Sequence, residues 1–296
     1  MGQSTVQRAM IDVNGVKLFY RDTGSDHPPM LCLHGRWGRG ETWTDLMFRL
    51  GDRYRIIAPD QRGHGLSDRP VARYASEDLA ADAYGLMVQL GCGPAIVVGH
   101  SMGGRIGGHI AALYPQQVRA LAILDEGADG PAELSELPPE EVPPVDPLTA
   151  DWPTPYPTYE EALQHLSSRF SETGVQYFLE SLVETVEGYD FLFSGYAMSA
   201  LAEYHRAWFH ILPLIKCPVL LVRATESWCL SREVADNMRP LIQDCTYFEV
   251  SRSDHMVYAD NPDEFYPQFD QFLERISSQR SSRMDDESEG HRCLRN

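Results

Sequence analysis

Ser101, in the stretch "AIVVGHSMGG", is the residue whose type and setting best suit nucleophilic chemistry. The apolar run before it predicts a buried strand, and "RIGGHIAALYP" after it predicts a helix. A serine at a sharp strand-to-helix turn needs almost no side chain two residues before and two residues after it, because the two backbones approach closely. Gly99 and Gly103 meet this requirement. The sequence therefore predicts a nucleophile exposed at a strand end.

His255, in "SRSDHM", is the candidate base for this serine. A serine hydroxyl is a weak nucleophile near neutral pH unless an imidazole accepts its proton. Of the 10 histidines, His255 is the best placed, because it follows the last predicted strand and should lie at the same sheet edge as Ser101.

Short apolar runs that alternate with longer amphipathic segments predict the elements that position these residues. The runs are "VKLFY", "PMLCLHG", "RIIAPD", "AIVVGHS", "ALAILD", "PVLLVRA" and "TYFEVS". Continuous apolar strands are typical of a parallel sheet that is covered on both faces. We therefore predict an α/β fold with a mostly parallel central sheet flanked by helices, formed by residues 1–129 and 214–276.

Residues 130–213 interrupt this alternation. The segment begins with the proline-rich and acidic stretch "PAELSELPPEEVPPVDPLTADWPTPYP" and continues with helical patterns from Tyr159 to Leu212. We expect a helical cap insertion over the carboxyl edge of the sheet, where ligands of open α/β sheets bind. Residues 277–296 are polar and are expected to form a disordered tail.

Four motifs give the chain a resemblance to the α/β-hydrolase family over nearly all of residues 10–275. They are "LHGRWG", "APDQRGHGLSD", "GHSMGG" and "SRSDHM". The resemblance implies a catalytic Ser101 and His255 and an oxyanion hole formed by the backbone N–H groups of Arg36 and Met102. A serine at the elbow also excludes reactions that use an aspartate nucleophile there.

The position at which many members of this family carry the catalytic aspartate or glutamate has no acidic residue in this chain. Their acid follows the strand after the cap, in a frame that resembles R-x-x-x-S-D-x-L-S. Here Arg223, Ser227, Leu230 and Ser231 keep the frame, but Trp228 replaces the aspartate. An indole cannot hold a negative charge against an imidazolium, so the acid must lie elsewhere.

Asp125 and Glu226 are the two candidates for the acid. Asp125 ends the run "ALAILD", beside the predicted nucleophile strand, and some family members resemble this arrangement. Glu226 lies in the usual turn but two residues early and on a longer side chain. We favour Asp125 because the buried strand before it would hold it rigidly, with Glu126 ranked third and Asp254 disfavoured because it adjoins His255.

Aromatic side chains are expected to line the substrate pocket. The candidates are Trp37, Trp208 and Trp228. The Arg36 side chain could meet an anionic substrate, but on an acidic chain we favour a salt bridge to a carboxylate.

Composition limits the partners. The formal charge of -18 would repel nucleic acid and anionic membranes. No run is long and apolar enough to cross a bilayer, and cysteines in apolar runs suggest a reducing, cytoplasmic location. No metal or other cofactor is expected.

These features together predict a serine hydrolase of a small-molecule carboxylic ester or lactone, acting through an acyl-enzyme on Ser101. One alternative uses the same groups to hydrolyse a carbon–carbon bond beside a ketone. Another is a ligand receptor built on the same fold, because a receptor can keep the serine and the histidine.

Overall fold

The computed structural model describes residues 6–131 and 136–293 and contains an eight-stranded sheet. The spatial order is β1-β2-β4-β3-β5-β6-β9-β10. The first two strands run antiparallel to their neighbours, and the other six strands are parallel to one another. The bounds are β1 Gln7–Val13, β2 Val16–Asp22, β3 Pro29–Leu33, β4 Arg55–Pro59, β5 Ala95–His100, β6 Val118–Leu124, β9 Val219–Ala224 and β10 Cys245–Val250.

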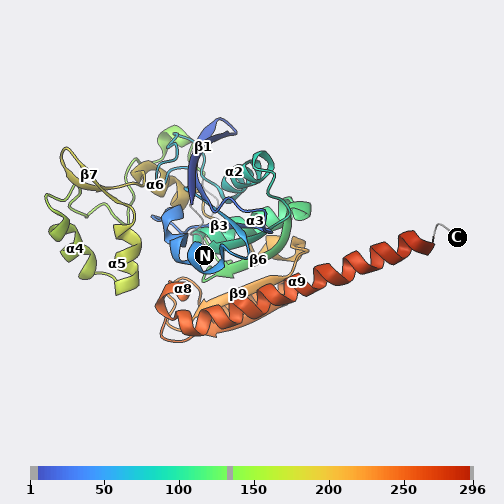
Figure 1. Cartoon of the computed structure of the whole chain (residues 1–296). Coiled ribbons are helices and arrows are strands. Elements are labelled where there is room, and N and C mark those ends of the chain that lie inside the picture. The colour runs from blue at the N-terminus through green and yellow to red at the C-terminus, as the bar shows by residue number, and fades with distance from the viewer. Residues whose placement is uncertain (1–5, 132–135, 294–296) are drawn as a thin grey trace.

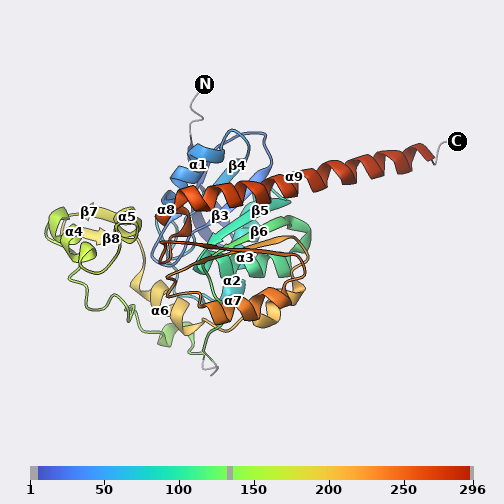
Figure 2. The same cartoon turned by 90° about the horizontal axis from the view of Figure 1, so that it is seen from below.

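Helices cover both faces of the sheet, as the continuous apolar strands predicted (Figure 2). One face carries α2 (Ser76–Gln89), α3 (Met102–Leu113) and α7 (Arg232–Met238), and the other carries α1 (Thr44–Leu50), α8 (Val257–Asp260) and α9 (Pro262–Cys293). Successive side chains of a strand point to opposite faces of the sheet. In β3, Leu31 and Leu33 belong to one hydrophobic cluster, and Met30 and Cys32 belong to the other. Five short 3-10 helices complete the described chain: η1 Gly40–Trp43, η2 Pro115–Gln117, η3 Pro139–Glu141, η4 Phe209–Leu214 and η5 Arg239–Leu241.

The insertion, residues 130–213, lies between β6 and β9 and is not purely helical. It contains α4 (Tyr159–Ser167), α5 (Glu172–Leu179) and α6 (Gly195–Glu203), but also an antiparallel hairpin of β7 (Leu182–Thr185) and β8 (Gly188–Phe191). In Figure 1, α4, α5 and the hairpin project from one side of the sheet layer. A small core of its own, built around Trp152, Tyr156 and Phe178, holds this part together.

The C-terminal segment differs from the expected disordered tail. Helix α9 continues through residues 277–293, and residues 294–296 lie outside the described residues. The first turns of the helix carry Phe265, Phe269 and Phe272, whose side chains are buried against the sheet. Forming the first turn of a helix is its unfavourable step, and here packing against the sheet stabilises the first turns. Because no proline follows Pro267, the helix can extend from them toward the C-terminus.

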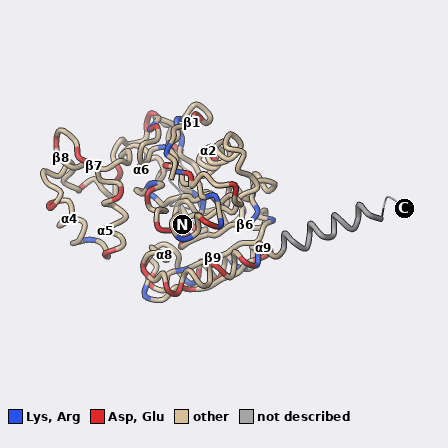
Figure 3. Tube along the Cα trace, viewed as in Figure 1, with Lys and Arg blue, Asp and Glu red and all other residues tan. Residues whose placement is uncertain are grey.

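Charged residues are distributed over the part of the chain that the structure describes. Figure 3 shows acidic and basic residues interspersed along both the sheet layer and the insertion. Across residues 6–131 and 136–293, no helix is both long and apolar enough to cross a membrane.

Candidate active site

Ser101 occupies a strained turn between β5 and α3. Its backbone has φ 52° and ψ -128°, a conformation that a non-glycine residue rarely adopts. A Cβ at Gly99 would lie 2.1 Å from the carbonyl oxygen of Gly103, and one at Gly103 would lie 2.1 Å from that of Leu33. Glycines are therefore obligatory at both positions, which is the physical requirement that the sequence pattern indicated.

Asp125 and His255 meet at the carboxyl ends of β6 and β10. The Asp125 carboxylate is fully buried, and its Oδ2 lies 2.8 Å from His255 Nδ1. Its Oδ1 accepts a hydrogen bond of 2.8 Å from the Ala224 N–H, at the end of β9. Because β6 pairs with both β5 and β9, the residue after it is carried to the same edge as Ser101.

The turn in which Trp228 stands in place of an aspartate donates a hydrogen bond to Asp125. The Ser227 hydroxyl donates to Asp125 Oδ2 at 2.7 Å and accepts hydrogen bonds from the N–H groups of Cys229 and Leu230. The serine of the family frame thus orients a carboxylate that comes from the neighbouring strand.

Among the described residues, none of the other three candidate acids forms a hydrogen bond or ion pair with the His255 ring like that of Asp125. Glu226 is exposed, and its backbone N–H donates to the Ser253 carbonyl. The Glu126 carboxylate is paired with Arg105 at 2.8 Å and accepts from the thiol of Cys229. Asp254 is half-buried in the wall of the hollow beside Ser101.

The imidazole of His255 is held between two other rings. Its centroid lies 4.5 Å from that of His100 and 4.5 Å from that of Trp228. Burial lowers the pKa of His255, while Asp254 and Asp260 act in the opposite direction, so the ring is neutral near pH 7 and can accept a proton. The Asp260 carboxylate also accepts hydrogen bonds from the backbone N–H groups of residues 254–256, which fixes the loop.

The pKa of the Asp125 carboxyl is raised by burial. Hydrogen bonds from the Ala224 N–H and the Ser227 hydroxyl favour its ionised form and oppose this effect. The ionised form of Asp125 is therefore stabilised by its hydrogen-bond donors, which include the His255 Nδ1–H group.

The backbone N–H groups of Arg36 and Met102 lie at the start of two segments that converge on Ser101. Met102 is the first residue of α3, where a helix leaves its N–H groups without intrahelical acceptors. Arg36 follows Gly35, where a Cβ would lie 3.1 Å from that of Ser101. In the described part of the chain, neither N–H donates to another backbone group. The expected oxyanion hole requires two such N–H donors without backbone acceptors.

A hollow of about 270 Å³ opens beside Ser101 and His255. Trp37 and Trp228 line it as expected, together with Arg169, Phe170, Tyr177 and Phe178 from the insertion. Its size suits a small ligand. The insertion thus contributes one wall of the space in which Ser101 lies.

Trp208 does not line this hollow, so its assignment to the pocket was wrong. The side chain is only 1% exposed and packs over Gly108 of α3, where a Cβ would meet the indole at 2.6 Å. Its Nε1 donates to the Gly127 carbonyl at 2.8 Å. A glycine opposite the indole creates a slot for packing, and sequence alone does not distinguish that slot from a pocket roof.

Sequence reasoning also missed residues around the site. Cys229 lies against Ser101, and its thiol donates to Glu126 Oε2 at 3.3 Å. Burial and the neighbouring carboxylates raise the pKa of this thiol. Asp146, in the insertion, binds the Arg36 guanidinium at 2.7 Å, which is the kind of salt bridge expected for Arg36. Such partners are more than 100 residues apart in sequence, and no local pattern signals them.

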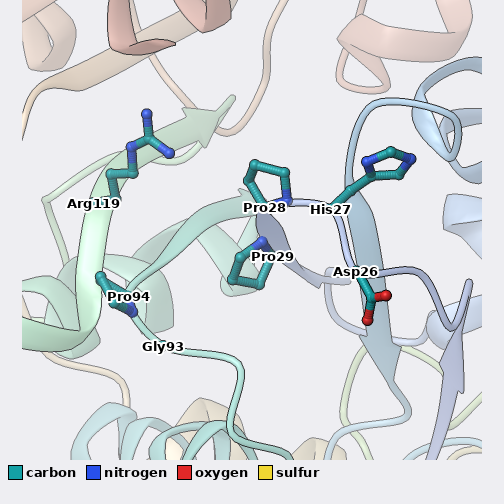
Figure 4. Close-up of a pocket in the computed structure, with 7 residues that line it drawn as sticks. All are labelled: Asp26, His27, Pro28, Pro29, Gly93, Pro94 and Arg119. Atoms are coloured by element: carbon teal, nitrogen blue, oxygen red, sulfur yellow. The ribbon is translucent and has the colours of Figure 1, made fainter. Parts of the chain in front are cut away.

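A second hollow lies at the opposite end of the strands. Figure 4 shows Pro29, Pro94 and Arg119 around it, at the amino ends of β3, β5 and β6, with Asp26 and His27 nearby. It is therefore remote from Ser101. Among the side chains that the structure describes, in residues 6–131 and 136–278, no three of His, Cys, Asp or Glu are grouped to hold a metal ion.

Known proteins share this architecture. A hydrolase of 2-(acetamidomethylene)succinate from Mesorhizobium japonicum is 44% identical over 115 residues, which make up 39% of this chain and 41% of that relative. The crystal structure of an E-2-(acetamidomethylene)succinate hydrolase superimposes with a TM-score of 0.78 at 28% identity, covering 91% of this chain and 99% of the other. An N-formylmaleamate deformylase of Pseudomonas putida is 25% identical over 89% of this chain and 95% of its own.

The model of the alpha/beta hydrolase family matches residues 30–268. That range holds all four sequence motifs and begins after the first two strands of the sheet. The chain therefore belongs to the alpha/beta hydrolase family.

Proposed function

We propose that the chain is a serine hydrolase that cleaves a small carboxylic ester or lactone through an acyl-enzyme on Ser101. The observation that carries this proposal is the convergence of three side chains on one sheet edge. Ser101 lies in a strained turn after β5, and the 2.8 Å contact between Asp125 and His255 presents an oriented imidazole in the same hollow. This is the combination of nucleophile, base and orienting acid that acyl transfer requires.

In the proposed reaction, Ser101 Oγ attacks the substrate carbonyl carbon and gives its proton to His255 Nε2. The carbonyl oxygen takes the negative charge and accepts hydrogen bonds from the Arg36 and Met102 N–H groups. The intermediate collapses, the bond to the leaving oxygen breaks, and His255 returns the proton to the alcohol. Water then attacks the acyl-enzyme with His255 as base, which releases the acid and restores Ser101. Asp125 stabilises the imidazolium in both steps.

The state of Arg36 argues for an ester or lactone over carbon–carbon bond hydrolysis. The latter would gain support from an Arg36 guanidinium free to grip a substrate carboxylate. Instead, its Nη2 donates to Asp146 Oδ1 and to the Met198 carbonyl, each at 2.7 Å. A neutral acyl group therefore fits this side of the site.

Hydrolysis of a small N-acyl substrate that carries a carboxylate is a second candidate. Two relatives are named as hydrolases of compounds of this kind, although the stronger sequence match covers less than half of that relative. Arg169 also places a cation in the wall of the hollow, where it is paired with the exposed Asp151 at 2.9 Å. Comparing kcat/KM for matched p-nitrophenyl esters, γ-lactones and N-acyl dicarboxylates would separate the two candidates.

Turnover of p-nitrophenyl acetate and butyrate tests the proposal directly. The parent protein should release many equivalents of p-nitrophenol, whereas Ser101→Ala should lose at least about 10⁴-fold in kcat and keep its thermal melting temperature. A single equivalent of release by the parent would favour the ligand receptor. A Ser101→Ala variant that keeps more than about one hundredth of the rate would exclude the mechanism.

A further inference from the structure

A buried carboxylate in the insertion binds the loop that carries the Arg36 N–H group. The side chain of Asp146 is fully buried and accepts four hydrogen bonds. Its Oδ1 accepts from Arg36 Nη2 at 2.7 Å and from the Leu148 N–H at 3.1 Å. Its Oδ2 accepts from Trp37 Nε1 at 2.8 Å and from the Thr149 hydroxyl at 3.2 Å. One charged group therefore links two neighbouring side chains of the core to a turn of the insertion.

The core loop that Asp146 binds has a conformation that needs support. Trp37 has φ 66°, in the left-handed region, where a side chain of this size is strained against its own backbone. The insertion holds this loop at two further points. The Tyr177 hydroxyl donates to the Arg36 carbonyl at 3.2 Å, and the Ser181 hydroxyl donates to the Trp37 carbonyl at 2.9 Å.

We propose that Asp146 is a positioning residue that completes the oxyanion hole when the insertion is seated on the core. Its carboxylate fixes the side chains of Arg36 and Trp37, and thereby the direction of the Arg36 N–H group. This inference rests on the proposed function and deepens it, because it makes one oxyanion donor depend on a contact between the insertion and the core. Asp146 does not itself touch the reacting atoms.

The geometry explains why the loop is sensitive to this contact. The Arg36 N–H belongs to the peptide between Gly35 and Arg36, and rotation about the bonds on either side of it would turn the donor away. Gly35 offers little resistance to such rotation. An oxyanion donor acts only when it points at the developing charge, and a misplacement of about 1 Å can cost about 10²-fold in rate.

Asp146→Asn is the sharpest test, because it keeps the shape and removes the charge. Arg36 and Trp37 donate to different oxygens of Asp146, so in the amide an NH2 group faces one of these two donors and that hydrogen bond is lost. We expect kcat for p-nitrophenyl butyrate to fall about 10²-fold while KM changes by less than about 3-fold. Asp236→Asn, which breaks the exposed pair with Arg239, is the matched control and should leave both constants unchanged.

Phenylboronic acid separates positioning from general loss of structure, because it forms a tetrahedral anionic adduct with a serine hydroxyl. Its inhibition constant should weaken at least about 10-fold in Asp146→Asn, whereas that of the product butyrate should stay within about 2-fold. Unchanged kcat and boronate inhibition in a folded variant would overturn the inference. A rise in KM alone would also overturn it, because Asp146 would then shape the substrate pocket.

Ser181→Ala keeps the inference testable if Asp146→Asn does not fold. It removes only the hydroxyl that holds the Trp37 carbonyl, so kcat should fall about 5-fold with boronate inhibition weakened in parallel. No change in either quantity would contradict the inference. A parent protein without turnover or boronate inhibition would overturn the proposed function and this inference together, whereas an active parent with unaffected variants would overturn the inference alone.

Discussion

Replacing Asp125 by asparagine should nearly abolish turnover, and the structure indicates how. One oxygen must still accept from the buried Ala224 N–H, as Oδ1 does at 2.8 Å. In the parent protein, Asp125 Oδ2 lies 2.8 Å from His255 Nδ1. In the variant, the amide NH2 group takes the place of Oδ2 and faces this nitrogen. The imidazole must present a lone pair there and carry its proton on Nε2, so it cannot accept the proton of Ser101.

The wrong tautomer at a triad of this kind costs about 10⁴-fold in kcat, or about 5.4 kcal/mol of transition-state stabilisation. Glu226→Gln is the matched comparison, because Glu226 is exposed and should change kcat by less than about 2-fold. Initial rates with p-nitrophenyl butyrate at pH 8, with melting temperatures to verify folding, measure both variants. A collapse in Glu226→Gln beside an active Asp125→Asn would refute the assignment of the acid.

Two further predictions concern the base and the misassigned tryptophan. Because burial lowers the pKa of His255, the imidazole stays neutral below its ordinary titration range. The acid limb of the kcat/KM profile, which reports the Asp125–His255 pair, should therefore have an apparent pKa below 6.5, and a value at or above 6.5 would contradict the buried geometry. Trp208→Ala should lower the free energy of unfolding in urea by about 3–5 kcal/mol while leaving the ratio of rates on short and bulky esters unchanged, and a changed ratio with full stability would return Trp208 to the pocket.

The parts of the site that the sequence predicted are those that neighbouring residues determine. The turn around Ser101 follows from Gly99 and Gly103, because a Cβ at either position would lie only 2.1 Å from a backbone carbonyl oxygen. The position of Asp125 follows from strand order, because a residue that ends a strand next to β5 must lie near Ser101. The first inference needed only the local pattern, whereas the second also used the family resemblance, which implied that the strand before Asp125 lies beside the nucleophile strand.

The parts that sequence did not predict depend on contacts between distant segments. Asp146 and Arg36 are 110 residues apart, and many other acidic residues could have served as partner. The hairpin of β7 and β8 lies in a stretch interpreted as helical, since short segments of an insertion are decided by packing against its small core rather than by propensity. Trp208 is of a residue type that often lines pockets, but the missing side chain of Gly108 lets its indole pack against α3 instead.

The account depends most on an acyl group passing through Ser101, and mass spectrometry of the protein quenched during turnover of p-nitrophenyl butyrate tests this directly. The intact mass should increase by one butyryl group, and the modified peptide should contain Ser101. The Ser101→Ala variant should show no such adduct. A butyryl group on Cys229, whose thiol lies beside Ser101, or steady turnover without any covalent adduct on Ser101, would contradict the proposed mechanism.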